Sequence, residues 1–250
     1  MDTIPVLYED EDLVIVDKPA GITVNRAETT KNEMTIQDWA EEKLSVISTS
    51  RRIARNDIGG SDFYNRGGVV HRLDKETSGV LILAKNPQAF IDLQKQFKDR
   101  TVKKTYIALS HGKVFPEAGE INVPVGRLPW NRKSFGIIPG GRESKTNYKV
   151  IKYYQNPKNK EIMTLLELYP QTGRTHQIRV HLKYIGHPVF SDFLYAGRKT
   201  ARNDRKILSR VFLHAGKISF IHPVTGKTVT YESHLSQDLS GFLTTALHIL

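Results

Sequence analysis

The stretch that decides the fold is residues 67–85, GGVVHRLDKETSGVLILAK. Two apolar runs, residues 69–70 and 80–84, enclose a polar segment that contains Asp74. Such runs predict strand ends, and the Ser-Gly pair between them is a turn signal. Because loops between buried strands often position reactive side chains, Asp74 is a candidate catalytic group. The residues alone leave open a solvated connection in which Asp74 bonds to its own turn.

The composition bounds the class of protein. A chain of 250 residues can bury one sizeable core or two small ones. It contains no cysteine, which excludes disulfides and thiolate chemistry and is typical of a reducing compartment. No segment has the unbroken apolar length of a membrane span, and the acidic start does not resemble a signal peptide. We therefore expect a cytoplasmic protein.

The positive charge of the chain is unevenly distributed. The formal net charge is +11, with a pI near 9.7. Residues 127–152 hold seven Lys and Arg against one acidic residue, and residues 197–210 hold six against one. This clustering favours RNA as a partner over an anionic membrane, because no basic amphipathic helix stands out. We expect contacts with the RNA backbone from two pairs of residues: Arg132 with Lys133, and Arg202 with Arg205.

Local signals predict several elements in the first half of the chain. Residues 13–16 are expected to form a strand that ends in a turn at Lys18 and Pro19, both assigned to architecture. Thr35 should cap a helix that runs to about residue 47. The polar residues 48–68 are interpreted as a mobile flap, with plain disorder as the alternative. An Asn-Pro pair should start a helix at residue 87, and residues 103–109 alternate like a strand.

The second half is predicted to alternate strands with two further helices. Residues 121–154 should form two strands around a basic excursion, whose Trp130 and Phe135 suit either RNA stacking or an ordinary anchored hairpin. A strand at residues 162–168 should precede a helix capped by Thr175 and ended by Gly186. The remaining expected elements are strands at 212–220 and 228–231 and a short helix within 239–250.

Three segments, taken together, resemble the motifs of the RluA-type pseudouridine synthases. Residues 71–79, HRLDKETSG, match the family signature without a gap. The turn at residues 17–21, the strand KKTYIAL at 103–109 and the segment QTGRTHQIRVHL at 171–182 resemble its other motifs in family order. A kinase catalytic loop is excluded because Leu73 separates Arg72 from Asp74 and no glycine-rich phosphate loop precedes them.

The resemblance implies roles for individual residues. Asp74 falls on the catalytic aspartate, Tyr106 on the tyrosine that stacks on the target base, and Arg179 on the ion-pair partner of the aspartate. An arginine partner would keep a buried carboxylate ionised and hold it by two hydrogen bonds. The resemblance also implies that the target base is flipped out of its stem, and that Arg72 fills the vacated space. Four further residues are expected near the flipped base: His71, Thr77, Arg174 and His176.

The implied reaction is isomerisation of specific uridines in ribosomal or transfer RNA to pseudouridine. We expect no cofactor, and no metal, since His176 and His181 are five residues apart and lack matching ligands. The implied fold is α+β: a single catalytic domain over residues 1–250, with a long, mainly antiparallel bent sheet and flanking helices. We expect a monomer without a separate N-terminal RNA-binding module. The alternative is a noncatalytic RNA-binding protein derived from this fold.

Overall fold

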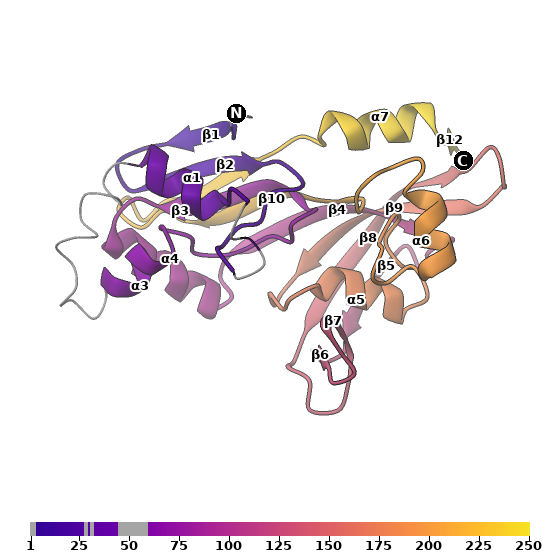
Figure 1. The fold of residues 1–250 in the computed structure, drawn as a ribbon, viewed down its shortest axis with the longest axis horizontal. Helices are drawn as coiled ribbons and strands as arrows, with labels where there is room; N and C mark the ends of the chain where they lie inside the picture. The colour runs from indigo at the N-terminus through magenta and orange to yellow at the C-terminus, as the bar shows by residue number, and fades with distance from the viewer. Residues whose placement is uncertain (1–3, 28–29, 31–32, 45–59) are drawn as a thin grey trace. The chain divides into compact units, whose positions relative to one another are not determined.

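A computed structural model describes residues 4–27, 30, 33–44 and 60–250 (Figure 1). The chain divides into two compact units. The first comprises residues 1–103 and 217–233, and the second comprises residues 104–216 and 234–250. Strand β10 (Leu213–Ile221) begins in the second unit and ends in the first. The expectation of one catalytic domain over the whole chain therefore stays a prediction.

The first unit is built around strand β3 (Ser78–Ala84), which is buried along its whole length. Its antiparallel neighbour is β2 (Leu13–Lys18), and β1 (Val6–Glu9) pairs with β2 in turn. The last part of β10 pairs antiparallel with β11 (Thr228–Glu232). The apolar runs that predicted β2 and β3 thus form adjacent buried strands.

Three helices complete this unit among its described residues. Helix α1 (Ile36–Lys43) begins at a capping box between Thr35 and Asp38, as predicted. Helix α4 (Pro87–Lys98) begins at Asn86, whose side chain accepts the N–H of Ala89, again as predicted. Helix α3 (Gly60–Asn65) lies where a loop was expected. Its Phe63 is buried and packs edge-on against Phe90 of α4. The rest of the expected flap, residues 48–59, lies outside the described residues.

The strands of the second unit follow the order β4 (Lys103–His111), β9 (Ile162–Pro170), β8 (Lys145–Gln155) and β12 (His248–Ile249). Strand β5 (Ala118–Asn122) also pairs with β8, and every one of these pairings is antiparallel. The basic excursion is a separate hairpin of β6 (Val125–Leu128) and β7 (Asn131–Ile137). This agrees with the α+β class and with mainly antiparallel pairing.

Helix α5 (Gln177–Tyr184) packs on the strands of this unit through Ile178 and Leu182. It starts later than predicted, because its N-cap is His176 in the left-handed region (φ 56°) and Thr175 does not cap it. Helix α6 (Arg198–Asp204) lies within the second basic run and was not expected. The expected C-terminal helix is α7 (Gln237–Thr245), followed by β12. In the described part of the chain, no helix is long and apolar enough to cross a membrane.

Candidate functional site

Asp74 opens a tight turn in front of β3. Its carbonyl oxygen accepts the N–H of Thr77 at 3.0 Å, and its side chain is partly exposed. Leu73 and Thr77 are buried on either side of the turn. The hydroxyl of Thr77 is fully buried and has no hydrogen-bond partner among the described residues. Buried neighbours on both sides leave Asp74 and Lys75 as the outer edge of the loop.

A buried lysine anchors this turn. Lys18 is completely inaccessible to solvent, and its ammonium donates to the carbonyl oxygens of Pro19 (2.8 Å), Ile22 (2.9 Å) and Lys75 (3.2 Å). The N–H of Gly21 also donates to the carbonyl of Lys75, at 2.8 Å. A buried ammonium is costly unless it is hydrogen-bonded, so these carbonyls fix its place. The contacts support the architectural role that the sequence suggested for Lys18.

His71 holds the other end of the loop. Its ring stacks on Phe97 of α4, with centroids 4.6 Å apart and planes at 24°. The backbone N–H of Ile82 in β3 donates to its Nε2 at 3.0 Å, which requires that nitrogen to be unprotonated. Arg72, between His71 and the buried Leu73, is exposed. The contacts of His71 are those of an anchor, and its contact with RNA stays a prediction.

Tyr106 lies in β4 of the second unit, opposite Leu168 of β9. It is half-buried and packs against the apolar cluster that includes Leu166 and Leu168. Lys104 precedes it by two residues and therefore projects from the same face of the strand. Burial lowers the pKa of Lys104 from 10.5 to about 8. A Cβ on Gly173 would lie 3.9 Å from its ammonium, so Lys104 reaches the loop before α5.

Arg179 of α5 is buried and forms a bidentate ion pair with Asp192. Its Nε and Nη2 donate to the two carboxylate oxygens at 2.7 and 2.8 Å. Asp192 has no exposed surface, and its Oδ1 also accepts the backbone N–H groups of Leu194 and Tyr195. This forked geometry fixes the plane of the guanidinium.

Tyr195 joins Arg179 to the hairpin of β6 and β7. The guanidinium carbon of Arg179 lies 5.0 Å from the centroid of the buried Tyr195 ring, within cation–π range. The hydroxyl of Tyr195 accepts the N–H of Phe135 in β7 at 2.9 Å and is hydrogen-bonded to Nδ1 of His176, 2.8 Å away. His176 also packs edge-on against Phe135. A continuous network therefore runs from the hairpin to Arg179.

Arg174 and Gln177 shape the loop in front of α5. The Nε of Arg174 donates to the carbonyl of Glu143, and its backbone N–H donates to Oε1 of Gln177. The same Oε1 accepts the hydroxyl of Thr172, while Nε2 of Gln177 donates to Thr146. Gln177 thus satisfies polar groups at the entry to the helix, a place normally taken by a cap.

The residues predicted to contact the RNA backbone differ in their surroundings. Lys133 in β7 and Arg202 in α6 are exposed. The backbone of Arg132 lies in β7. Arg205 is half-buried, and its guanidinium donates to the carbonyls of Ser191 and Ser209. Its contacts are structural, and phosphate binding by these four residues stays a prediction.

Asp10, Asp12 and His222 have ligand-type atoms within 4.8 Å of one another. Hydrogen bonds account for the arrangement, since Asp10 accepts from His222 Nε2, the Tyr8 hydroxyl and two backbone N–H groups. Asp12 accepts from Asn86. We assign this cluster to structure.

The two units share the predicted site residues between them. Asp74, Arg72, His71 and Thr77 belong to the first unit, and Tyr106, Arg179, Arg174 and His176 belong to the second. That Arg179 pairs with Asp74 stays a prediction. Lys104, Asp192 and Tyr195 were not among the residues predicted from the sequence. Strand alternation could have flagged Lys104, whereas no local signal marks the other two.

Comparisons with known proteins agree on one family. A family model described as RNA pseudouridylate synthase matches residues 12–184. The uncharacterized RNA pseudouridine synthase YlyB of Bacillus subtilis is 35% identical over 94% of this chain and 70% of its own length. The ribosomal large subunit pseudouridine synthase D of Nitrosomonas europaea is 36% identical over 95% of this chain and 64% of its own length. The chain thus spans about two thirds of these curated relatives.

A solved structure shares the fold. The human RNA pseudouridylate synthase domain containing 1 covers all of this chain, with 90% of its own chain aligned. The TM-score is 0.72 at 24% sequence identity.

Proposed function

Because this chain belongs to the RNA pseudouridylate synthase family, we propose that it converts specific uridines in structured ribosomal or transfer RNA to pseudouridine, with Asp74 as the essential carboxylate. One observation carries the proposal. The nine-residue signature at 71–79 is intact, lies inside the matched region, and forms a loop anchored by Lys18 and by the stack of His71 on Phe97. Such support is what a reactive carboxylate needs in order to be held in one geometry.

The reaction is an isomerisation, so uridine and pseudouridine have the same atomic composition. The bond between N1 of uracil and C1′ of ribose breaks, the base turns, and C5 bonds to C1′. The C5 proton leaves and N1 regains a proton, so no oxidant, reductant or second substrate takes part. In this mechanism ionised Asp74 acts at the sugar, either by adding to it or by removing a ribose proton.

The other residues are assigned by what their environments allow. Tyr106 offers one face of its half-buried ring to the base and its hydroxyl to the C5 proton. Arg179, held by Asp192, supplies a guanidinium of fixed orientation that would pair with the catalytic carboxylate. We assign exposed Arg72, two residues before Asp74, to the space that the flipped base leaves in the RNA stem.

Tritium release tests this function. RNA transcribed with uridine tritiated at C5 is incubated with the protein, and tritium that appears in water counts turnovers. We expect release by the wild type and by Asp92→Asn, which removes a carboxylate from α4 outside the loop, and none by Asp74→Asn. A tenth of the normal rate in Asp74→Asn would contradict the essential role of that group. Binding without release by the wild type would favour the noncatalytic alternative.

We also propose that the protein acts as a monomer in the cytoplasm. The absence of cysteine supports a reducing compartment. Light scattering coupled to size-exclusion chromatography tests the first point, since a mass of twice 28.4 kDa would contradict it.

A further inference from the structure

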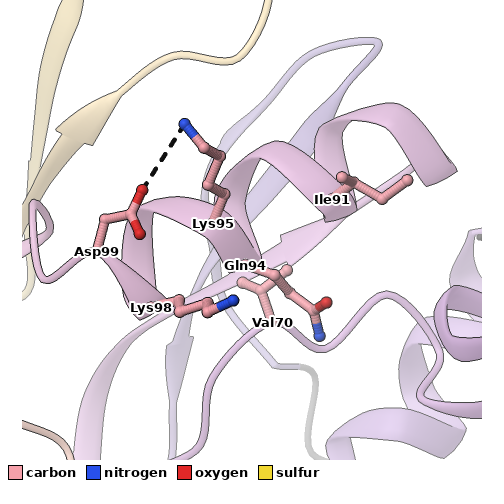
Figure 2. A pocket seen from close by; sticks show the side chains of 6 residues that line it. All are labelled: Val70, Ile91, Gln94, Lys95, Lys98 and Asp99. Carbon is pink, nitrogen blue, oxygen red and sulfur yellow. Dashed lines mark ion pairs between the residues drawn. The ribbon is translucent and has the colours of Figure 1, made fainter.

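A pocket of about 520 Å³ lies on helix α4 beside the start of the Asp74 loop (Figure 2). Helix α4 contributes most of its wall, and Val70 contributes the rest. Figure 2 shows the side chains of Gln94 and Lys98 extending from the helix on the side where Val70 lies. The full lining consists of Val70, Ile91, Gln94, Lys95, Lys98 and Asp99.

The chemistry of the lining suits a phosphate carried on an apolar or sugar-like group. Lys95 and Lys98 supply two ammonium groups, Gln94 supplies an amide, and Ile91 keeps 44% of its surface exposed. The single carboxylate, Asp99, lies 3.7 Å from Lys95, with side chains 49% and 76% exposed. An ion pair this long and this exposed contributes little, so Lys95 can exchange it for a phosphate at low cost.

The pocket is coupled to the catalytic loop in two ways. Val70 directly precedes His71, and Asp74 is the fourth residue after Val70, which limits the distance between their Cα atoms to roughly 14 Å. The helix that carries both lysines also carries Phe97, on which His71 stacks. A ligand in the pocket would therefore lie within a few nucleotides of a uridine placed at Asp74.

We propose that this pocket binds a backbone phosphate and its ribose in the RNA that contains the target uridine, at a nucleotide flanking it; the inference rests on the proposed function. An open pocket suits a continuous polymer, which must enter and leave it, better than a small metabolite. The excess of positive charge in the chain adds a general attraction for such a polyanion. The pocket then fixes the register of the RNA next to the loop.

The test compares two double variants that remove equal charge. Lys95→Gln/Lys98→Gln changes the pocket, and Lys158→Gln/Lys160→Gln changes two exposed lysines in the turn between β8 and β9. Affinity is measured by fluorescence anisotropy with a labelled stem-loop RNA that has a uridine in its loop, at several salt concentrations. We expect the pocket variant to bind several-fold more weakly and its salt slope to fall by about 0.7 to 1.8, for one or two lost phosphate contacts. The control should retain the wild-type slope.

A third variant should act in the opposite direction. Asp99→Asn removes the carboxylate that opposes a phosphate, so its affinity for the same RNA should rise. Equal salt slopes in the two double variants, or weaker RNA binding by Asp99→Asn, would overturn the proposal that the pocket binds RNA. Tritium release at saturating RNA separates this inference from the proposed function. The Lys158→Gln/Lys160→Gln control should turn over within about twofold of wild type, whereas a wild type that binds RNA but releases no tritium overturns the function alone.

Discussion

Replacing Asp192 with asparagine should expose how much the protein depends on the position of Arg179. Asp192 is fully buried and accepts two hydrogen bonds from the guanidinium, at 2.7 and 2.8 Å, and two from backbone N–H groups. The amide keeps the shape but loses the charge, and it turns an N–H donor toward the guanidinium. Arg179 would then be a buried cation whose described carboxylate partner is gone.

The cost follows from the burial of both groups. Removing one partner of a buried ion pair destabilises a protein by about 3–5 kcal/mol, because the remaining charge stays desolvated. For a chain of this length each kcal/mol lowers the melting temperature by about 2–4 °C. We therefore expect Asp192→Asn to melt roughly 6–20 °C below the wild type.

Asp238 provides a matched control. It also makes a bidentate pair with a buried arginine, Arg210, but its own side chain is 48% exposed. The charge left by Asp238→Asn is the buried guanidinium of Arg210. The hydroxyl of Ser236 still accepts one of its N–H groups, and water can reach the half-exposed site of Asp238, so the expected cost is smaller than for Asp192→Asn. Both variants replace, with asparagine, an aspartate that pairs with a buried arginine. The two aspartates differ in their own burial and in their distance along the chain from α5.

Calorimetry gives the melting temperatures, and tritium release gives kcat and KM at a temperature where all variants are folded. We expect Asp192→Asn to lose at least tenfold in kcat, because in the proposed mechanism a tilted guanidinium would no longer support Asp74, while Asp238→Asn keeps the wild-type value. Equal stability in the two variants would refute the burial argument. Normal kcat in a destabilised Asp192→Asn would limit Asp192 to a structural role.

Three further predictions follow from single groups. Burial lowers the pKa of His111, but hydrogen bonds to the carboxylates of Asp204 and Glu161 outweigh it and raise the pKa to about 9. The stabilisation from protonated His111 is complete below pH 6.5 and is lost as the pH rises through 9. Between pH 7 and 10, the free energy of unfolding in urea should therefore fall by about 2–3 kcal/mol more in the wild type than in His111→Gln. Parallel pH profiles of the two proteins would contradict this. Tyr106→Phe keeps the ring but lacks the hydroxyl, so it should bind RNA normally and release tritium slowly, and equal rates would confine Tyr106 to packing. Lys18→Met removes the ammonium that donates to three carbonyl oxygens and should cost several kcal/mol in denaturant unfolding; an unchanged midpoint would show that water replaces the ammonium.

Local signals explain why much of the fold could be predicted from the sequence. Strands β2 and β3 are continuous apolar runs, and Thr35 and Asn86 cap their helices through contacts within three residues. Helix α3 was missed because it is polar apart from Phe63 and Tyr64, and Phe63 is buried only because α4 packs against it. Propensity cannot report a partner that lies far along the chain.

The same distinction applies to the site. The start of α5 was misplaced because Thr175 is a good cap by type, whereas the side chain of Gln177 takes the polar groups there. Asp192 and Tyr195 were missed because they lie 13 and 16 residues after Arg179, beyond the end of α5, where no regular spacing links them to it. Motif residues carry a local pattern that can be recognised, and the residues that hold them in place do not.

Substitutions at the buried cations should have different effects from substitutions at the reactive groups. Lys18 and Arg179 are each fixed by oxygen acceptors inside their own unit, and each adjoins or carries a predicted catalytic element. A group that both buries a charge and positions a reactive residue cannot be removed without loss of stability and of rate. Asp74 and Tyr106 are partly exposed, so the changes to Asn and Phe remove chemistry while most of the packing remains. Substitutions at the supports should therefore lower the melting temperature and the rate together, and substitutions at the reactive groups should lower the rate alone.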